Sequence, residues 1–398
     1  MTNIAILGFG VVGSGVAKLI TDNRCEVTKL AGDEINIKYV LDLRDFPESA
    51  FADKVIHDYS LIVNDPDVSV VIEVMGGSHP AYEYTVAALK AGKSVITSNK
   101  EVVANFGDEF LSLAKENGVC YRFEAAVGGG IPVISPMISC IGQNKVSEAR
   151  GILNGTTNYI LTQMFSYGQS FENALRDAQK KGYAESNPDA DILGTDACRK
   201  TAILTALISG KLLPTEKIHT EGITKIRDND VSAAEKMGAT IKLVGRGINK
   251  EGELFAMVAP FIVPVTMPLS GVNGVYNAVE VIAEPLGNVM FYGQGAGAGA
   301  TASAVVGDLM QVMASGIHYS APVFEKSENM LDFGEFSSKH YLALCRECCD
   351  KVSARIPESV IIENGDEFAL ITPKLTENEL SDMLAELNIV PKSHIRML

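Results

Sequence analysis

The sequence lacks the features that would place a protein in a membrane, on a nucleic acid or outside the cell. No uninterrupted apolar run approaches the ~18 residues that a membrane helix needs. Lys and Arg number 34 against 49 Asp and Glu, so the net charge is −15 and basic surface for phosphate-rich partners is scarce. The N-terminus has no basic segment of the signal-peptide type. We therefore expect a cytoplasmic protein with no nucleic-acid or membrane partner.

Paired cysteines are also scarce. The seven cysteines are odd in number and mostly isolated, which is typical of reduced intracellular thiols rather than of a disulfide framework. The exception is Cys345-x-x-Cys348-Cys349, and no second ligand pair at the spacing of a metal site accompanies it.

With 398 residues, 46% of them hydrophobic and 21% charged, the chain suits a globular protein of two or three domains.

The first 130 residues alternate short apolar runs with helical segments. Strands are expected at 4–7, 35–41, 69–74, 93–98 and 119–125. Helices are expected at 14–20, 80–91 and 101–117. This alternation predicts an α/β fold with a doubly wound parallel sheet of the Rossmann type.

The pattern changes after residue 130. An α+β region follows, with strands expected at 146–153, 255–263 and 279–283 and helices at 170–181, 195–209 and 233–241. A glycine run at 293–299 leads into a helix at about 300–315. The tail predicts strand 339–345, helix 346–355, strands 359–363 and 367–371, helix 377–387 and strand 393–397, which is the ferredoxin-like βαββαβ order.

These patterns predict three domains. The first is a nucleotide-binding domain at 1–130, completed by about 295–318. The second, at 131–294, would bind substrate and form the dimer. The third is a small domain at 320–398.

Residues 8–13 read Gly-Phe-Gly-Val-Val-Gly, between the first expected strand and the first expected helix. In this context Gly8 allows a tight turn, Gly10 lets a pyrophosphate approach the backbone, and Gly13 lets the helix pack on the strand. The helix N-terminus then offers N–H groups and a favourable dipole to phosphates. We interpret the segment as a binding site for NAD or NADP.

Two residues after the second expected strand bear on the choice between these cofactors. Asp42 would bind the ribose 2′-hydroxyl of NAD, whereas Arg44 would bind the 2′-phosphate of NADP. Both occur within three residues, and either could be a solvated loop charge. The sequence therefore leaves the cofactor preference open.

The densest group of charges lies at residues 182–200. Its charged members are Glu185, Asp189, Asp191, Asp196, Arg199 and Lys200. Such a cluster suits a small zwitterionic substrate and a proton-transfer group. Asp196 and Lys200 are four residues apart on an expected helix and so share a face, although an exposed Asp–Lys pair is the structural alternative.

Three other segments hold candidate ligand-binding residues. Lys100 follows an expected parallel strand, at the edge where doubly wound sheets bind ligands. Thr156 or Thr157 would cap a helix, whose N–H groups could hold a substrate carboxylate. Glu124 and the glycines at 128–130 would offer oxygen ligands to a cation, or would form a hinge.

Together these motifs resemble homoserine dehydrogenase over residues 1 to about 315. Six ordered segments carry the resemblance: Gly-Phe-Gly-Val-Val-Gly at 8–13, Ser-Asn-Lys at 98–100, Glu-Ala-Ala-Val-Gly-Gly-Gly-Ile-Pro at 124–132, Asn-Gly-Thr-Thr-Asn-Tyr-Ile at 154–160, the 182–200 cluster and Gly-Ala-Gly-Ala-Gly at 295–299. The resemblance implies an NAD(P)-dependent oxidoreductase that interconverts L-homoserine and L-aspartate 4-semialdehyde. That reaction lies on the route to threonine, methionine and isoleucine.

The resemblance also implies residue roles. The catalytic residues would be Lys200, as the acid/base, and Lys100. The substrate-binding residues would be Glu185, Asp196, Thr156 and Tyr183, with Asp191 as a supporting acid. The cofactor-binding residues would be Gly8, Phe9, Gly10, Val11, Val12, Gly13, Arg44, Lys100 and Gly299. A sodium ion would be held by Glu124 and the carbonyls of Val127, Gly129 and Ile131.

The tail resembles the family less closely. Many members carry a C-terminal ACT domain, which has the βαββαβ order, but residues 339–357 lack the Pro-Gly turn usual in amino-acid-sensing members. We expect a degenerate ACT-like domain with a structural or oligomerising role rather than threonine feedback. The resemblance also implies a homodimer or homotetramer.

Two other functions are alternatives. An aldehyde dehydrogenase of the semialdehyde or phosphoglyceraldehyde kind needs a nucleophilic cysteine, for which Cys140 is the nearest candidate, yet no cysteine has a convincing base partner. A nonenzymatic NAD(P)-sensing regulator would not need the set of Lys100, Glu185, Asp196 and Lys200, and the acidic charge argues against DNA contact.

Overall fold

The computed structural model describes residues 1–250, 252–315 and 321–398, so the domain boundaries expected at 318 and 320 lie outside the described residues. Contacts divide the chain into two compact units. Unit 1 comprises Met1–Val146, Ala202–Thr215 and Ala283–Ser327, and unit 2 comprises Ser147–Thr201, Glu216–Ile282 and Glu328–Leu398. The division into three domains stays a prediction. Among the described residues, no helix is both long and apolar enough to cross a bilayer.

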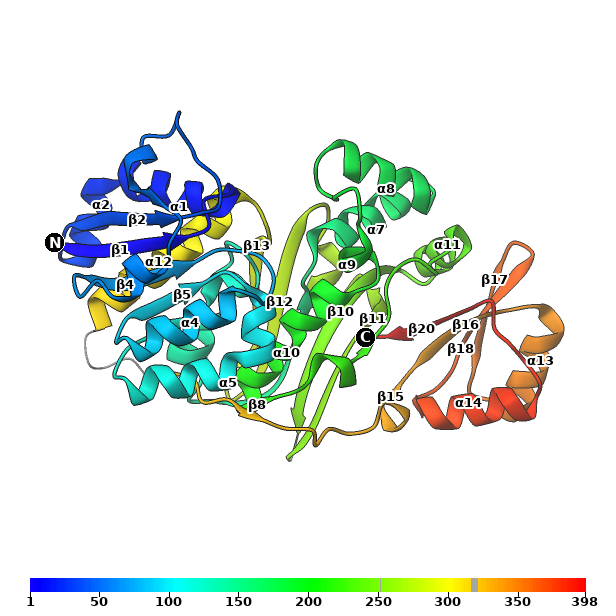
Figure 1. The fold of residues 1–398 in the computed structure, drawn as a ribbon. Coiled ribbons are helices and arrows are strands. Elements are labelled where there is room, and N and C mark those ends of the chain that lie inside the picture. The colour runs from blue at the N-terminus through cyan, green and yellow to red at the C-terminus, as the bar shows by residue number, and fades with distance from the viewer. Residues whose placement is uncertain (251, 316–320) are drawn as a thin grey trace. The chain divides into compact units, whose positions relative to one another are not determined.

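Unit 1 is built on a parallel sheet with the order β3-β2-β1-β4-β5-β6 (Figure 1). Its strands are β1 (Thr2–Leu7), β2 (Ile35–Leu41), β3 (Val55–Ile56), β4 (Val68–Glu73), β5 (Ser94–Thr97) and β6 (Tyr121–Arg122). The strand order reverses between β1 and β4, so the loops after these strands form a ligand-binding crevice in folds of this kind. The predicted doubly wound sheet is confirmed.

Helices cover this sheet. They are α1 (Val11–Asp22), α2 (Arg24–Ala31), α3 (Ser60–Val63), α4 (Ala81–Lys90), α5 (Lys100–Glu116), α6 (Ile134–Pro136) and α12 (Ala298–Ser315), with the short turns η1 (Ala52–Lys54), η2 (Glu124–Ala126) and η3 (Met137–Ile141). Alternate strand residues such as Ile4, Ile6 and Ile72 share one core with Val16 of α1 and Val305 of α12. Helix α12 thus completes a core that is otherwise formed early in the chain.

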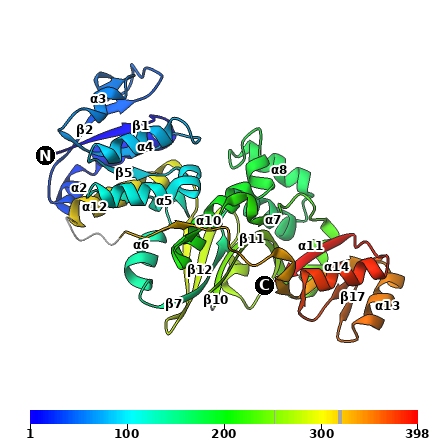
Figure 2. The same cartoon turned by 60° about the horizontal axis from the view of Figure 1, so that its bottom comes forward.

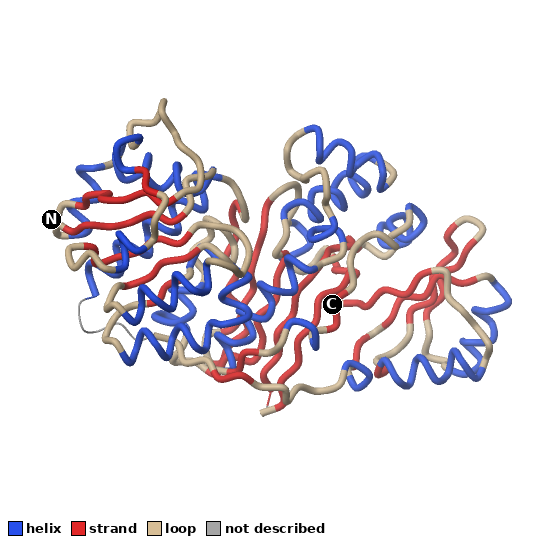
Figure 3. The backbone as a smooth tube through the Cα atoms, in the orientation of Figure 1, coloured by secondary structure: helices blue, strands red, loops and turns tan. Residues whose placement is uncertain are grey.

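Unit 2 contains a mixed sheet, whose strands are drawn in red in Figure 3. Its strands run in the order β12-β7-β10-β11-β20-β16-β18-β17. Its first part is formed by β7 (Lys145–Ile152), β9 (His219–Thr220), β10 (Ala239–Lys250), β11 (Glu253–Pro264) and β12 (Tyr276–Glu284). The helices of this region are α7 (Gly155–Tyr167), α8 (Phe171–Lys180), α9 (Asp189–Ile192), the first part of α10 (Thr195–Ser209) and α11 (Asp228–Lys236), with η4 (Thr215–Lys217) and η5 (Pro268–Gly271). The residues of α10 from Ala202 onward belong to unit 1. The short strands β8 (Lys211–Leu212), β13 (Gly287–Gln294) and β14 (Glu325–Lys326) belong to unit 1.

The C-terminal segment of unit 2 has the predicted βαββαβ order. Its elements are η7 (Phe333–Glu335), β15 (Ser337–Ser338), β16 (His340–Leu344), α13 (Arg346–Arg355), β17 (Val360–Asn364), β18 (Glu367–Ile371), β19 (Leu375–Thr376), α14 (Glu377–Glu386) and β20 (Ser393–Met397). Neighbours in its sheet, β20-β16-β18-β17, are antiparallel. Helices α13 and α14 lie beside this sheet (Figure 2). They share one core with it through residues such as Leu342, Val352 and Leu380.

This segment is joined firmly to the rest of unit 2. Strand β20 pairs in parallel with β11. Tyr341 Oη and Ser393 Oγ donate hydrogen bonds to the two carboxylate oxygens of Asp230 in α11, at 2.9 and 2.7 Å. The Asp230 side chain is fully buried, so these bonds satisfy a charge that would otherwise be costly to bury.

One sequence-based expectation is wrong. The helix expected at 233–241 lies instead at Asp228–Lys236, and Ala239–Lys250 is a strand of 12 residues. That strand pairs with β11 from Ala239 to Lys250. The apolar spacing of residues 239–241 suits either a buried strand or the end of a helix. These residues form a strand because they pair with residues 253–264, which lie later in the chain.

Candidate active site

The glycine-rich loop of unit 1 joins β1 to α1 as predicted. Gly8 has a φ of +92°, a conformation that L residues rarely adopt. A Cβ at Gly13 would lie 2.0 Å from the carbonyl oxygen of Gly8, so only glycine lets α1 approach the loop this closely. Gly10 is exposed, and the nearest neighbour of a Cβ placed there would be Arg44 Nη2 at 4.0 Å. The loop therefore leaves its backbone open to a phosphate.

The other predicted cofactor contacts of the loop differ in exposure. The Phe9 ring is buried, with its centroid 5.1 Å from that of Phe46. Val11 is exposed and Val12 is half-buried at the start of α1. Gly299 is exposed in the first turn of α12, which adjoins α1, since a Cβ at Gly15 would lie 3.3 Å from the Ala298 oxygen.

Asp42 and Arg44 lie against this loop as an ion pair. The Phe9 N–H donates to Asp42 Oδ2 at 2.7 Å, while Arg44 Nε and Nη2 donate to its two oxygens at 3.0 and 3.1 Å. These hydrogen bonds, above all those from Arg44, hold the pKa of Asp42 at about 2. The Asp42 side chain is 9% exposed and the Arg44 side chain 64%. Asp42 thus stabilises the loop through its hydrogen bond from Phe9, and the exposed Arg44 side chain is the charged group that a ligand can contact.

The ends of β4 and β5 are tied together by buried polar groups. Glu73 accepts hydrogen bonds from Thr97 Oγ1 at 2.6 Å and from the Met75 N–H at 2.8 Å. Burial raises the pKa of Glu73 to about 7. Asn99 caps α5 by accepting from the N–H of Glu101 at 3.2 Å, which places half-buried Lys100 as the first helical residue. Lys100 therefore lies at the carboxyl edge of the sheet, as predicted.

In unit 2, the side chain of Asn154 joins three parts of the chain. Its Oδ1 accepts from the Thr157 N–H at 2.9 Å, so Asn154 caps α7 and the expectation of a cap at Thr156 or Thr157 is wrong. Its Nδ2 donates to Asp191 Oδ1 at 2.7 Å and to Asp196 Oδ2 at 2.9 Å. Burial raises the pKa of Asp191, and the charge of Asp196 adds to this effect. A single amide thereby holds two carboxylates together.

Lys200 belongs to the same cluster. Its Nζ donates to Asp196 Oδ2 and to the carbonyl of Leu153, each at 2.7 Å. The Lys200 and Asp196 side chains are only 11% and 10% exposed, so they do not form the surface pair of the structural alternative. An ammonium has three N–H donors, and within the described part of the chain these bonds use two of them. One donor remains for a ligand.

The other predicted substrate residues lie on α7 or contact residues of α7 and α8. Thr156 is buried and donates from Oγ1 to the carbonyl of Tyr183 at 2.6 Å. Tyr183 is 43% exposed, and its ring centroid lies 5.0 Å from that of Tyr159. Glu185 is exposed, and Gln179 Nε2 donates to its backbone carbonyl at 3.2 Å. The structure therefore brings Asp191, Asp196 and Lys200 together, while the carboxylate of Glu185 is on the surface of the described chain.

Sequence reasoning missed two members of the cluster, the Asn154 amide and the Leu153 carbonyl. The signal for Asn154 was present, because an Asn that follows a strand and precedes a helix is a strong N-cap residue. Its bonds to Asp191 and Asp196 could not be read from the chain, since they join residues 37 and 42 positions apart.

The predicted cation-binding segment is buried in unit 1. The carboxylate of Glu124 accepts hydrogen bonds from the N–H groups of Val133, Ile134 and Ser135, at 2.6, 2.8 and 2.6 Å. The Glu124 N–H donates to Asp308 Oδ2 at 2.8 Å. Burial, together with the charge of Glu124, raises the pKa of Asp308 to about 7. Val127, Gly129 and Ile131 are buried beside this network.

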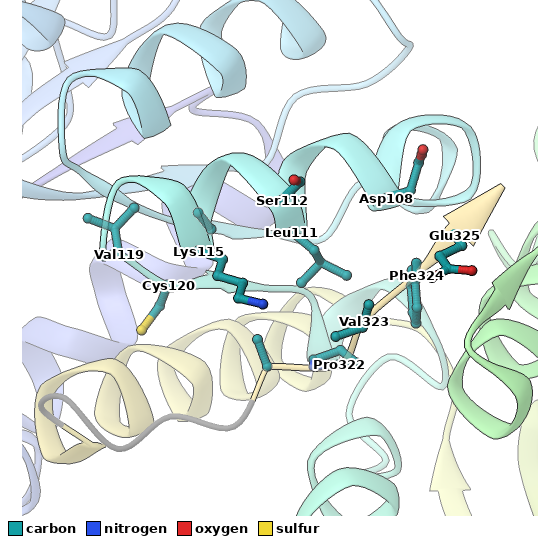
Figure 4. A pocket seen from close by; sticks show the side chains of 13 residues that line it. Asp108, Leu111, Ser112, Lys115, Val119, Cys120, Pro322, Val323, Phe324 and Glu325 are labelled. Carbon is teal, nitrogen blue, oxygen red and sulfur yellow. The ribbon is translucent and has the colours of Figure 1, made fainter.

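Cys140 and a pocket of unit 1 are two further features that lie outside these groups. Cys140 is exposed, and its Sγ lies 3.5 Å from Ser139 Oγ, which is no general base. A pocket of about 650 Å³ in unit 1 is lined by residues of α5 and by 321–325 (Figure 4). The predicted site residues are not among the residues that line it.

Comparison with known proteins identifies the family. A family model for the homoserine dehydrogenase NAD-binding domain matches residues 8–124, and one for homoserine dehydrogenase matches residues 132–310. The homoserine dehydrogenase of Bacillus subtilis (strain 168) is 36% identical over 97% of this chain and 94% of its own length. The chain belongs to the homoserine dehydrogenase family. It is thus an NAD(P)-dependent oxidoreductase of amino-acid biosynthesis, which disfavours the aldehyde dehydrogenase and regulator alternatives.

Solved structures agree with this assignment. A homoserine dehydrogenase from Thiobacillus denitrificans aligns with a TM-score of 0.92 at 31% identity, covering 100% of this chain and 98% of that one. A hyperthermophilic archaeal homoserine dehydrogenase mutant, solved in complex with NADPH, aligns with a TM-score of 0.66 at 28% identity. It covers 78% of this chain and 97% of its own.

The buried carboxyl of Glu73 generates a prediction about stability. A folded-state pKa of about 7 lies above the ordinary value of 4.5, so Glu73 favours the fold below about pH 4.5 and loses this contribution as the pH rises through 7. We expect Glu73→Gln to remove up to about 3 kcal/mol of the wild-type loss in the free energy of unfolding between pH 4.5 and pH 8.

Urea denaturation at a series of pH values measures this effect. The exposed Glu26→Gln variant is the matched control and should follow the wild type. Asp308→Asn should flatten the profile in the same direction, because burial also raises the pKa of Asp308. A Glu73→Gln profile parallel to that of the wild type would contradict the assignment of Glu73.

Proposed function

We propose that Lys200 transfers the proton in the interconversion of L-homoserine and L-aspartate 4-semialdehyde. The observation that carries the proposal is its buried Nζ, which Asp196 and the Leu153 carbonyl hold at 2.7 Å while one N–H stays available. A proton-transfer group must be fixed within hydrogen-bond reach of the reacting oxygen, and these two contacts supply that rigidity.

The bound nicotinamide supplies or accepts the hydride. In the biosynthetic direction, Lys200 gives a proton to the aldehyde oxygen as it becomes an alkoxide. In the reverse direction, Lys200 removes the hydroxyl proton. Asp196 accepts a hydrogen bond from the lysine and so orients its Nζ, and the Asn154 amide keeps Asp196 in place.

The substrate's ammonium group needs carboxylate partners. We propose Asp196 and Glu185 for this role, with Thr156 and Tyr183 beside them and Lys100 on the cofactor side. Asp191 supports Asp196 through their shared bonds to Asn154.

Replacement of Lys200 tests the proposal. Lys200→Ala should lower kcat by about 10²- to 10⁴-fold, because that is the usual contribution of a positioned acid or base. Steady-state assays with L-homoserine and NAD(P) measure the loss. Lys236→Ala, an exposed lysine of α11, is the control and should keep wild-type kcat. A kcat within threefold of the wild type for Lys200→Ala would assign proton transfer to another group.

We propose that the enzyme prefers NADP(H) to NAD(H). Asp42 is engaged by Phe9 and Arg44 and is nearly buried, so it is poorly placed to accept a bond from the 2′-hydroxyl of NAD. Arg44 is largely exposed beside the glycine loop and can reach a 2′-phosphate. The archaeal relative solved with NADPH is consistent with this preference.

Replacement of Arg44 separates the two cofactors. Arg44→Ala should lower kcat/KM for NADPH by about 10- to 100-fold, the equivalent of a lost charge-assisted hydrogen bond, and leave kcat/KM for NADH nearly unchanged. Kinetics with aspartate semialdehyde and each cofactor give the ratio. Lys29→Ala, an exposed residue of α2, should keep the wild-type ratio. Equal losses for both cofactors would remove Arg44 from 2′-phosphate recognition.

We also propose a monovalent cation, such as sodium, at Glu124, Val127, Gly129 and Ile131. Because the Glu124 carboxylate already accepts three N–H bonds, backbone carbonyls would supply most of the oxygen ligands.

We further propose that the enzyme assembles as a homodimer or homotetramer and that it is located in the cytoplasm.

We propose that the C-terminal segment is a degenerate ACT-like domain with a structural role. Helix α13 begins two residues after β16 ends, which leaves no room for a ligand-binding loop between them. Strand β20 and the buried Asp230 bonds attach the segment to unit 2 instead.

Threonine titration tests this role. The full-length enzyme should keep its activity in millimolar threonine, because the loop that would bind the amino acid is absent. Initial rates with L-homoserine, at cofactor saturation, measure the response. Strong inhibition would contradict the structural role.

A further inference from the structure

The three cysteines at 345–349 have no part in the proposed reaction. We propose that Cys345 and Cys348 form a redox-active dithiol that reacts with low-molecular-weight disulfides. The proposal concerns the C-terminal segment and does not depend on the roles given to Lys200 and Arg44.

The fold brings the two thiols together. Strand β16 ends at Leu344 and α13 begins at Arg346, so Cys345 is the N-cap of the helix and Cys348 is its third residue (Figure 1). An N-cap side chain faces the N–H of the third helical residue. The Cys345 and Cys348 thiols are near enough for each to shift the pKa of the other. Both side chains therefore belong to the first turn of α13, and rotation about their side-chain bonds can bring the sulfurs together to form a disulfide.

The three cysteines differ in access. Cys345 is exposed, Cys348 is half-buried, and Cys349 is fully buried in the core formed by α13, α14 and the sheet. An incoming disulfide can therefore reach Cys345 first. Cys348 is shielded but adjacent, which is the arrangement required to complete the exchange. Cys349 points into the core, where burial raises the pKa of its thiol to about 11 and keeps it unreactive.

The surroundings favour Cys345 as the attacking group. The neighbouring Cys348 thiol lowers the pKa of the Cys345 thiol, and the positive end of the helix dipole acts in the same direction. The neighbouring Cys345 thiol in turn raises the pKa of Cys348. Neighbouring charges are paired: Arg346 lies 3.3 Å from Asp350 and 4.0 Å from Glu363, and Lys351 lies 2.7 Å from Glu347. Charges of both signs thus border Cys345.

The reaction balances in two exchanges. The Cys345 thiolate attacks the oxidant R–S–S–R, which gives Cys345–S–S–R and one RS⁻. The Cys348 thiolate then attacks the Cys345 sulfur, which gives the Cys345–Cys348 disulfide and a second RS⁻. Both thiol protons pass to the released thiolates or to solvent. The protein dithiol is oxidised by two electrons and R–S–S–R is reduced to two RSH.

The experiment exposes the reduced full-length protein to oxidised glutathione, quenches with acid and maps the products by mass spectrometry. The wild type should lose two hydrogen atoms and yield a cross-linked 345–348 peptide. Cys348→Ser should stop at a glutathione adduct on Cys345, and Cys345→Ser should yield neither product in this segment. Cys25→Ser and Cys140→Ser, which remove exposed lone thiols, should leave the cross-link unchanged.

Rates provide a second readout. Cys345 should be consumed at least about threefold faster than exposed Cys25 in the same sample, because a thiol at a helix N-terminus has a larger thiolate fraction near pH 7. Thermal melting of each variant establishes that it is folded. A stable glutathione adduct at Cys345 of the wild type, or equal rates for Cys345 and Cys25, would overturn the proposal.

Discussion

The two hydrogen bonds from the Asn154 amide, to half-buried Asp191 and buried Asp196, are the constraint on which the proposed substrate site depends. Asp191 and Asp196 would repel each other if left alone, and a buried carboxylate without donors is costly. Asn154 supplies two donors, Lys200 supplies the counter-charge, and the cap of α7 fixes the amide in turn. One residue, the N-cap of α7, thereby holds both carboxylates of the proposed substrate site and, through Asp196, the lysine proposed for proton transfer.

In unit 1, hydrogen bonds to a carboxylate likewise hold the backbone of the glycine loop. Asp42 accepts from the loop backbone and from Arg44, so a carboxylate that would otherwise serve a ribose stabilises the turn. Glu73 ties β4 to the end of β5, just before the helix that begins with Lys100. In both units, buried carboxylates hold the backbone at strand ends, where an α/β fold binds its ligands.

Sequence reasoning succeeded where the signal is local. The bounds of β2, α10, α13, β18 and β20 agree with the expected segments, because hydrophobic period and capping residues are local properties. It failed for β10, whose identity is set by pairing with β11. In the site, the spacing of Asp196 and Lys200 on one helix was readable, whereas the Asn154 amide and the Leu153 carbonyl were not.

The sequence by itself determined the family, the parallel nucleotide-binding sheet, the glycine loop and the candidate proton-transfer lysine. Only the tertiary structure decided which charges are buried and which are presented. Asp42 is nearly buried while Arg44 is exposed, Glu185 lies on the surface, and Cys345 is exposed while Cys349 is buried. The physical reason is that burial and hydrogen bonding depend on segments that are distant in the chain, and these set the chemistry of a charged group more than its own identity does.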